Sequence, residues 1–312
     1  MKNLDLKSTR QGFGDALLKI AKENKDVYAL CADLSESLSL GEFSKQFPEN
    51  YIECGVAEQN MIGIAAGLAS ENKIPFASSF AVFSPGRTWD QIRVSVCISN
   101  LPVKIVGGHG GLSNFKDGAS HQAYEDVAIS RVLPNLKVVV PCDYNQTIHL
   151  IEKTILDPSP TYIRLSSEKI EDITEKNQKY EIGVAQKLTK GNDLIIISCG
   201  PIINRILKAL DKTNIKATVI NMHTIKPLDT EIIDEALEVC RNIITVEDHQ
   251  IIGGLGSAIA EYLSEQNKKV KFKRIGICDT FGLSARSIED LYKHFKLDEN
   301  SLAKQFEEFL DS

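Results

Sequence analysis

The sequence has no closely spaced pair of cysteines. Its seven cysteines are odd in number and scattered through mostly apolar segments, at Cys31, Cys54, Cys97, Cys142, Cys199, Cys240 and Cys278. A disulfide framework or a zinc site needs cysteines at short, paired spacings, so this pattern argues against both. We expect reduced, buried thiols in a reducing compartment.

Long apolar runs and clusters of positive charge are also absent. Apolar runs such as 194–199 are far shorter than the roughly 20 residues that a membrane-spanning helix needs. A net charge of -6 and a pI near 5.6 provide no positive field for a phosphate backbone. We therefore expect a cytoplasmic protein that binds neither a membrane nor a nucleic acid.

The 312 residues instead show a regular alternation of short β-branched runs and longer segments of helical period. This alternation is typical of parallel sheets covered by helices, and the length favours two domains. We predict an α/β fold with two such domains. Strands are expected at 27–32, 74–78, 103–106, 137–140 and 162–165, and later at 193–199, 216–221, 242–246 and 271–277. Helices are expected at 57–71, 122–132 and 145–156.

Between the two series the chain becomes charged and loses its apolar period, from Ser166 to Lys190. Such a segment is typical of an exposed connection between domains. We place a first domain at 1–168, a linker at 169–190 and a second domain at 191–312.

Two local patterns remain ambiguous when taken alone. Glu58 is the only carboxylate of the segment 55–69, where a first-turn acid commonly complements the helix dipole. The small residues that follow it, such as Gly63 and Gly67, would let another helix close over Glu58. The Gly253-Gly254-Leu255-Gly256-Ser257 turn follows a strand and weakly imitates a dinucleotide-binding loop.

The Glu58 segment gains a more specific interpretation from several other sequence blocks, which occur in the same order as in a known family. The run Ile52-Glu53-Cys54-Gly55-Val56-Ala57-Glu58-Gln59 resembles the stretch of transketolases and deoxyxylulose-phosphate synthases that contains their cofactor-activating glutamate. Further blocks fit at 32–37 (ADLSES), 78–83 (SSFAVF), 117–122 (DGASHQ), 224–229 (TIKPLD) and 245–249 (TVEDH). The resemblance covers nearly the whole chain, as a thiamine-diphosphate-binding pyrimidine domain followed by a transketolase C-terminal domain.

The resemblance implies a cofactor role for several residues. Glu58 would share a proton with N1′ of the aminopyrimidine of thiamine diphosphate and so promote its activation. Phe83, with Phe80, would form the aromatic wall on which that ring stacks. Asp33 corresponds to a position near the thiazolium part of the cofactor.

A second set of residues would face the sugar. The resemblance assigns hydrogen bonding and proton transfer at the sugar oxygens to His109 and His121, and contact with a hydroxyl group to Asp117. Ser37 matches a serine that contacts the sugar phosphate. Transketolases place an arginine at the position of Ser167 and an aromatic residue at Gly86, so we expect Arg164 to supply the positive charge for a phosphosugar.

The Gly-Asp-Gly motif that holds the diphosphate through a metal ion is missing. We therefore expect a separate N-terminal diphosphate-binding subunit that carries Mg2+ or Ca2+, and a homodimeric contact that gives a heterotetramer. The predicted activity is that of a transketolase subunit, which transfers a two-carbon ketol unit from a ketose to an aldose through a thiamine-bound carbanion. Alternatives are the beta subunit of a 2-oxo-acid dehydrogenase, a deoxyxylulose-phosphate-synthase-like enzyme, and a non-catalytic nucleotide-binding or regulatory module.

Overall fold

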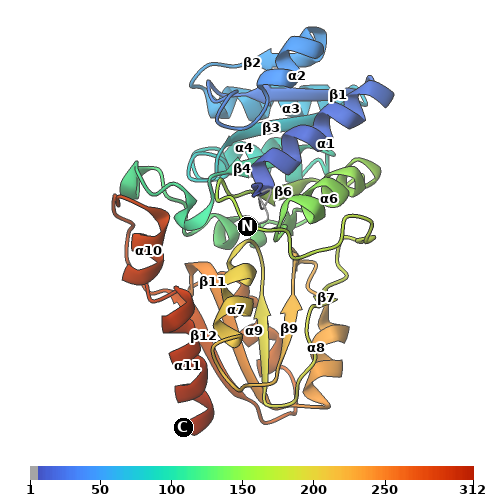
Figure 1. The fold of residues 1–312 in the computed structure, drawn as a ribbon. Helices are drawn as coiled ribbons and strands as arrows, with labels where there is room; N and C mark the ends of the chain where they lie inside the picture. The colour runs from blue at the N-terminus through green and yellow to red at the C-terminus, as the bar shows by residue number, and fades with distance from the viewer. Residues whose placement is uncertain (1–5) are drawn as a thin grey trace.

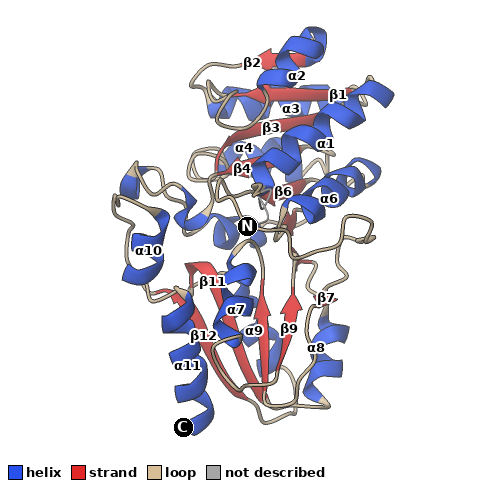
Figure 2. Ribbon diagram, viewed as in Figure 1, coloured by secondary structure: helices blue, strands red, loops and turns tan. Residues whose placement is uncertain are grey.

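The computed structural model of the chain describes residues 6–312 and contains one sheet in each of two lobes, stacked end to end (Figure 1). Residues 1–5, at the start of the first predicted domain, lie outside the described residues. Both sheets are mostly parallel and are flanked by helices (Figure 2), which confirms the predicted α/β class. Each predicted strand is present, with shifts of a few residues at its ends.

The sheet of the first lobe has seven strands in the order β10-β5-β6-β4-β3-β1-β2. The strands are β1 (Val27–Cys31), β2 (Tyr51–Glu53), β3 (Ile74–Phe80), β4 (Lys104–Gly108), β5 (Lys137–Val139), β6 (Thr161–Arg164) and β10 (Thr224–Lys226). All neighbouring pairs run parallel except β10 with β5. The carboxyl ends of β1, β3, β4 and β6 therefore meet at one edge, where ligands of open parallel sheets usually bind.

The sheet of the second lobe has five strands in the order β12-β11-β8-β9-β7. They are β7 (Gln186–Lys187), β8 (Leu194–Ser198), β9 (Ala217–Asn221), β11 (Asn242–Gln250) and β12 (Lys271–Ile277). Only β7 is antiparallel to its neighbour. β8 and β9 are buried on both faces and mostly apolar, because helices cover both faces of the sheet.

Helices cover both faces of each sheet. In the first lobe they are α1 (Thr9–Glu23), α2 (Gly41–Gln46), α3 (Glu58–Ser70), α4 (Trp89–Gln91), the π-helix η2 (Ile92–Cys97), α5 (Asp126–Arg131) and α6 (Tyr144–Leu156), with short 3-10 turns at Pro48–Asn50, Gly111–Ser113 and Gly118–Ser120. In the second they are α7 (Ile202–Leu210), α8 (Thr230–Leu237), α9 (Leu255–Ser264), α10 (Ile288–His294) and α11 (Glu299–Asp311). One apolar core runs through both lobes, from Met61 of α3 to Ile259 of α9, so the lobes share buried surface.

Two findings differ from the predicted organisation. Thr224–Lys226 belongs by sequence to the second domain but pairs with β5 of the first sheet. The linker predicted as exposed is partly buried, because Ile170, Thr174 and Tyr180 are each less than 10% exposed and the hydroxyl of Thr174 donates to Asp143. The division at 169–190 therefore stays a prediction, and one strand from beyond it, Thr224–Lys226, completes the sheet of the first lobe.

The helix predicted at 122–132 begins later, at Asp126. The amide of Gln122 donates to the carbonyls of Asn114 and Leu283, and its oxygen accepts from the hydroxyl of Tyr124. These bonds hold the preceding residues in a loop against the second lobe. The loop around Phe115 and the segment before α10 consequently lie side by side in Figure 1, joined by the Ala285 N–H on the carbonyl of Phe115.

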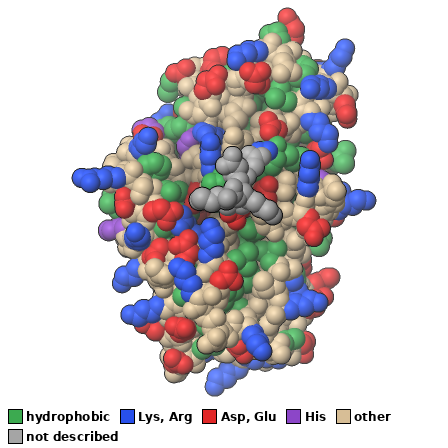
Figure 3. All heavy atoms as spheres, in the orientation of Figure 1, with side chains coloured by type: hydrophobic (Ala, Val, Ile, Leu, Met, Phe, Trp, Pro, Cys, Tyr) green, Lys and Arg blue, Asp and Glu red, His purple; other side chains and the backbone are tan. Residues whose placement is uncertain are grey.

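The face of the molecule drawn in Figure 3 shows no dominant charge. Positive and negative side chains are interspersed over the face drawn in Figure 3. Within residues 6–312, every helix is too short or too polar to cross a membrane.

Candidate active site

The strand ends of the first sheet bring four predicted aromatic side chains together. Phe80 ends β3 and His109 follows β4, and their ring centroids lie 4.3 Å apart. Phe83 is stacked on Phe80 with ring centroids 6.2 Å apart, and Phe83 and His121 form a T-shaped pair with centroids 5.2 Å apart. The predicted aromatic wall and the two predicted sugar-facing histidines thus form a single cluster.

Glu58 lies in the first turn of α3, beside that cluster. Its side chain is 2% exposed, and its Oε2 accepts a hydrogen bond of 2.7 Å from Nη1 of Arg87. The guanidinium of Arg87 also lies 4.7 Å above the ring centroid of Phe83. A buried carboxylate and an aromatic face that a single planar group can contact together are what a planar, hydrogen-bonding ligand would need.

His109 is held in an unusual backbone conformation, with φ at 56°. Its Nε2 lies 3.2 Å from Nη1 of Arg10. Burial, reinforced by the Arg10 charge and opposed by Asp117, lowers the pKa of His109 to about 4. His109 is therefore neutral at pH 7, and because arginine can only donate, Nε2 accepts and the proton sits on Nδ1.

Arg10 is positioned by the start of α1. Ser8 and Gln11 form a capping box there, in which each side chain bonds the other residue's backbone N–H. The hydroxyl of the buried Thr9 donates to the carbonyl of Ser166. With the first turn fixed in this way, Nη1 of Arg10 donates to the carbonyl of Ser37 at 2.6 Å and also reaches His109.

The remaining predicted residues lie on loops around the cluster. Asp117 is exposed, with its charge close enough to act on His109. Nδ1 of His121 is hydrogen-bonded to the hydroxyl of Ser120 at 2.8 Å. Asp33 is exposed, with a φ of 59°, and its contact with the Glu58 region is indirect.

That indirect contact runs through Glu53. Its Oε1 accepts from the backbone N–H of Asp33 at 2.8 Å and from that of Gly55 at 3.0 Å. Its other oxygen accepts from the hydroxyl of Tyr51. Glu53 therefore ties the turn after β1 to the loop that precedes Glu58.

Arg164 does not join the cluster, which corrects its predicted role in sugar binding. It is 4% exposed, and its guanidinium donates to Asp126 at 2.9 Å and to Asp248 at 2.7 Å. The hydroxyl of Tyr162 donates to the same Asp126 carboxylate. Because Asp248 comes from β11, Arg164 is a buried ionic link between the two lobes.

Two arginines of the site escaped the sequence-based prediction. The sequence around Arg10 does not indicate a role in the site, because Arg10 contacts Ser37 and His109 only once α1 has packed against the strand ends. Arg87 had a weak signal, since it follows Phe83 by four residues, which is the spacing at which side chains meet on a helical turn. Its backbone N–H does donate to the carbonyl of Phe83.

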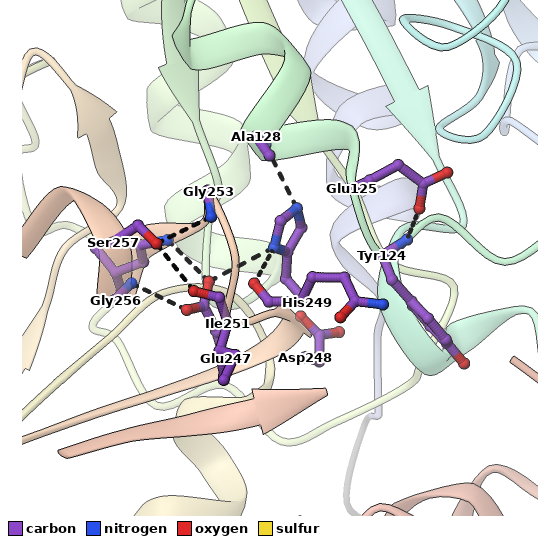
Figure 4. Close-up of polar contacts among 12 residues, drawn as sticks. Tyr124, Glu125, Ala128, Glu247, Asp248, His249, Ile251, Gly253, Gly256 and Ser257 are labelled. Carbon is purple, nitrogen blue, oxygen red and sulfur yellow. Dashed lines mark hydrogen bonds and ion pairs between the residues drawn. The ribbon is translucent and has the colours of Figure 1, made fainter. Parts of the chain in front are cut away.

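The glycine turn of the second lobe begins a helix whose N-terminus is already filled. The carboxylate of Glu247 accepts from the N–H groups of Leu255 and Gly256, at 2.8 and 2.9 Å. Figure 4 shows Glu247 and Gly256 in this contact. Burial raises the pKa of Glu247 to about 7, although these two hydrogen bonds oppose the shift. A phosphate would have to displace this carboxylate, so the geometry disfavours the alternative of a nucleotide-binding module.

His249 stands beside Glu247 and joins the lobes. Its Nε2 accepts from the N–H of Ala128, at the start of α5 (Figure 4). Its Nδ1 lies 2.7 Å from the carbonyl of Gln250. Among residues 6–312, histidine, cysteine and carboxylate side chains form no group of three that is placed to hold a metal ion.

Comparison with known proteins agrees with this geometry. The family models for the transketolase pyrimidine-binding domain and the transketolase C-terminal domain match residues 6–171 and 183–302. The chain is 43% identical to a Methanocaldococcus jannaschii protein named "Putative transketolase C-terminal section", covering 97% of this chain and 96% of that protein. It is 37% identical to one of the subunits of the apulose-4-phosphate transketolase of Phocaeicola vulgatus, covering 96% and 97%.

A solved structure described as a split gene transketolase, inactive beta4 tetramer, superposes with a TM-score of 0.88 at 38% identity, covering 97% of this chain and 98% of that one. Relatives named as transketolase subunits thus match along nearly their whole length, which fits a transketolase better than a 2-oxo-acid dehydrogenase. The chain belongs to the transketolase family, as a subunit of the split type that carries the pyrimidine-binding and C-terminal domains.

Proposed function

We propose that this chain, together with a separate diphosphate-binding chain, transfers a two-carbon ketol unit from a phosphorylated ketose to an aldose. The observation that carries the proposal is that one planar group, the Arg87 guanidinium, bonds the buried Glu58 carboxylate and also lies over the face of Phe83, whose ring is in T-shaped contact with His121. A planar aminopyrimidine fits this set, because it offers a face for Phe83 and a ring nitrogen for Glu58.

Thiamine diphosphate, when bound, supplies the acidic thiazolium carbon that this chemistry needs. Glu58 would hold a proton at the pyrimidine N1′, and Phe83 with Phe80 would exclude water from that ring. Asp33, on the turn tied down by Glu53, would border the thiazolium side. We assign the metal ion that holds the diphosphate, Mg2+ or Ca2+, to the partner chain, because the diphosphate motif is missing from this sequence.

The sugar would lie between His109, His121 and Asp117. His121 is half-buried and its Nδ1 is hydrogen-bonded to Ser120, which leaves Nε2 to exchange a proton at a sugar oxygen. Of the two roles predicted for His109, hydrogen bonding fits better than proton transfer, because a pKa of about 4 keeps the ring neutral. It would donate a hydrogen bond through Nδ1 to an oxygen of the phosphosugar.

A phosphate group suits the far end of this site. Nδ1 of His109 and Nε of Arg10 are both buried without a hydrogen-bond partner in residues 6–312, so two N–H donors await an acceptor. Ser37 lies next to Arg10. Arg10 thus supplies the positive charge that the sequence assigned to Arg164. One relative is named for a phosphorylated substrate, apulose 4-phosphate.

Replacing Arg10 with Met tests the phosphate assignment. A charge-assisted hydrogen bond to phosphate contributes about 1.5 to 3 kcal/mol, so we expect KM for a phosphorylated ketose to rise about 10- to 100-fold. KM for the same ketose without phosphate should change little. The matched control is Lys22→Met, an exposed position on the same helix. Equal effects on the two ketoses would refute a role for Arg10 in phosphate binding.

The partner proposal makes a direct prediction about cofactor binding. We expect the isolated chain to bind thiamine diphosphate and Mg2+ too weakly for calorimetry, and the complex co-purified from the native host to bind both and to transfer ketol units. The mass of the complex should fit two copies of each chain. Gly63 and Gly67 of α3 are exposed with open space above them, which suits the packing of a second copy.

Tight binding of thiamine diphosphate by the isolated chain would contradict the need for a partner. A co-purified complex that binds the cofactor but transfers no ketol unit between any sugar pair would contradict the proposed reaction.

A further inference from the structure

The side chain of Arg87 touches the two groups between which the proposed function places the aminopyrimidine ring. Nη1 donates to Oε2 of Glu58 at 2.7 Å, and Cζ lies 4.7 Å above the centre of the Phe83 ring. A guanidinium is planar, stacks on aromatic faces and offers N–H donors at its rim. It satisfies both groups in the way that a planar heterocycle would.

The backbone of Arg87 is held on both sides, whereas its side chain borders the solvent. The N–H of Arg87 donates to the carbonyl of Phe83 at 2.9 Å, and its own carbonyl accepts from the side chain of Gln59. The preceding Gly86 lies so close to Val82 that a Cβ there would come 2.2 Å from the Val82 carbonyl oxygen. The Arg87 side chain is nevertheless 48% exposed, so it can turn outward without moving this tight backbone.

The burial of Glu58 explains why a positively charged or hydrogen-bonding group is needed beside its carboxylate. Its carboxylate is 2% exposed, and a buried charge without a partner is strongly unfavourable. Across residues 6–312, Arg87 is the only side chain with which Glu58 forms an ion pair or a hydrogen bond. In the chain by itself, Arg87 therefore compensates the charge on which the cofactor site is built.

We propose that Arg87 is a placeholder for the aminopyrimidine: it fills the slot between Glu58 and Phe83 in the free subunit and is displaced to the surface when the cofactor binds. This inference rests on the proposed function. Arg87 is then a positioning residue, which keeps the slot formed and the carboxylate paired before assembly. Cofactor binding has to break its contacts, so Arg87 lowers the affinity for the cofactor.

The direction in which the cofactor affinity changes when Arg87 is replaced separates this role from a merely structural one. Calorimetry of thiamine diphosphate with Mg2+ on the assembled complex should show about 5- to 20-fold tighter binding for Arg87→Met, because a partly exposed ion pair and a cation–π contact no longer compete. Arg87→Lys, which keeps the charge but not the planar stacking group, should fall between. The matched control Arg241→Met, at an exposed position of the second lobe, should bind like the unmodified complex.

The isolated chain provides a second readout. The probe is 4-amino-5-hydroxymethyl-2-methylpyrimidine, the ring half of the cofactor, observed by saturation-transfer NMR. We expect a clear signal with the Arg87→Met chain and a much weaker one with the unmodified chain, and loss of the signal when Glu58→Gln is added to Arg87→Met. Circular dichroism should show that each variant is folded; if Arg87→Met is not, Arg87→Lys takes its place.

Unchanged or weaker cofactor affinity in folded Arg87→Met and Arg87→Lys complexes would overturn the placeholder role. If Glu58→Gln impairs turnover in the same complexes, the proposed function stands and only the placeholder fails. Normal turnover and normal cofactor affinity in the Glu58→Gln complex would instead remove the proposed function, and the placeholder with it.

Discussion

Replacing Glu58 with Gln should reduce ketol transfer by the assembled enzyme about 10²- to 10⁴-fold, the usual contribution of a positioned proton-transfer group. Gln has nearly the same shape and is neutral, so it can still approach a ring nitrogen but cannot share a proton with it as a carboxyl group does. The loss should appear in kcat with sugars and cofactor at saturation.

The matched control is Glu71→Gln, the same substitution at the exposed end of the same helix. It should leave turnover within about twofold of normal, because it changes the net charge equally but lies away from the cluster. A Glu58→Gln enzyme that turns over at the rate of the Glu71→Gln enzyme would eliminate Glu58 as the cofactor-activating acid.

Replacing Arg164 with Met should lower the free energy of unfolding by about 3 to 5 kcal/mol. The change leaves the carboxylates of Asp126 and Asp248 buried without their positive partner. It also removes a link between β6 of the first lobe and β11 of the second. Urea unfolding followed by far-UV circular dichroism would measure the difference.

Two variants show whether the effect comes from burial. Arg131→Met breaks an ion pair with Glu261, whose side chain is 62% exposed, and should cost about 1 kcal/mol or less. Combining Arg164→Met with Asp126→Asn and Asp248→Asn removes all three charges and should restore much of the lost stability. A destabilisation by Arg164→Met no greater than that of Arg131→Met would contradict the buried ionic link.

Most strands of both sheets could be predicted because they are buried. Segments such as Leu194–Ser198 are covered by helices on both faces, so every residue must be apolar or small, and the run stands out in the sequence. The edge strands Tyr51–Glu53 and Gln186–Lys187 were missed, because a short, half-exposed strand needs no such run. Thr224–Lys226 was missed for a different reason, since its partner strand belongs to the other lobe.

The cluster of Glu58, Phe83, His109 and His121 was also predictable, although not from residue spacing alone. Each of these residues follows or ends a recognisable element of the first sheet, and parallel strands bring their carboxyl ends to one edge. The order of the matching blocks identified the elements, and the topology then brought the side chains together.

The sequence by itself determined which chemical groups this protein carries: an acid in a small-residue helix, two phenylalanines and two histidines beyond strand ends, and arginines of unassigned role. Only the tertiary structure decided which arginine does what. Arg10 lies 99 residues from His109 and 27 from Ser37, and Arg164 lies 84 from Asp248. No pattern in the neighbouring sequence predicts contacts over such separations, because they form only when helices dock on the sheets and the lobes pack together. For that reason only the structure shows that Arg164 links the two lobes, that Arg10 lies beside Ser37 and His109, and that Arg87 is paired with Glu58.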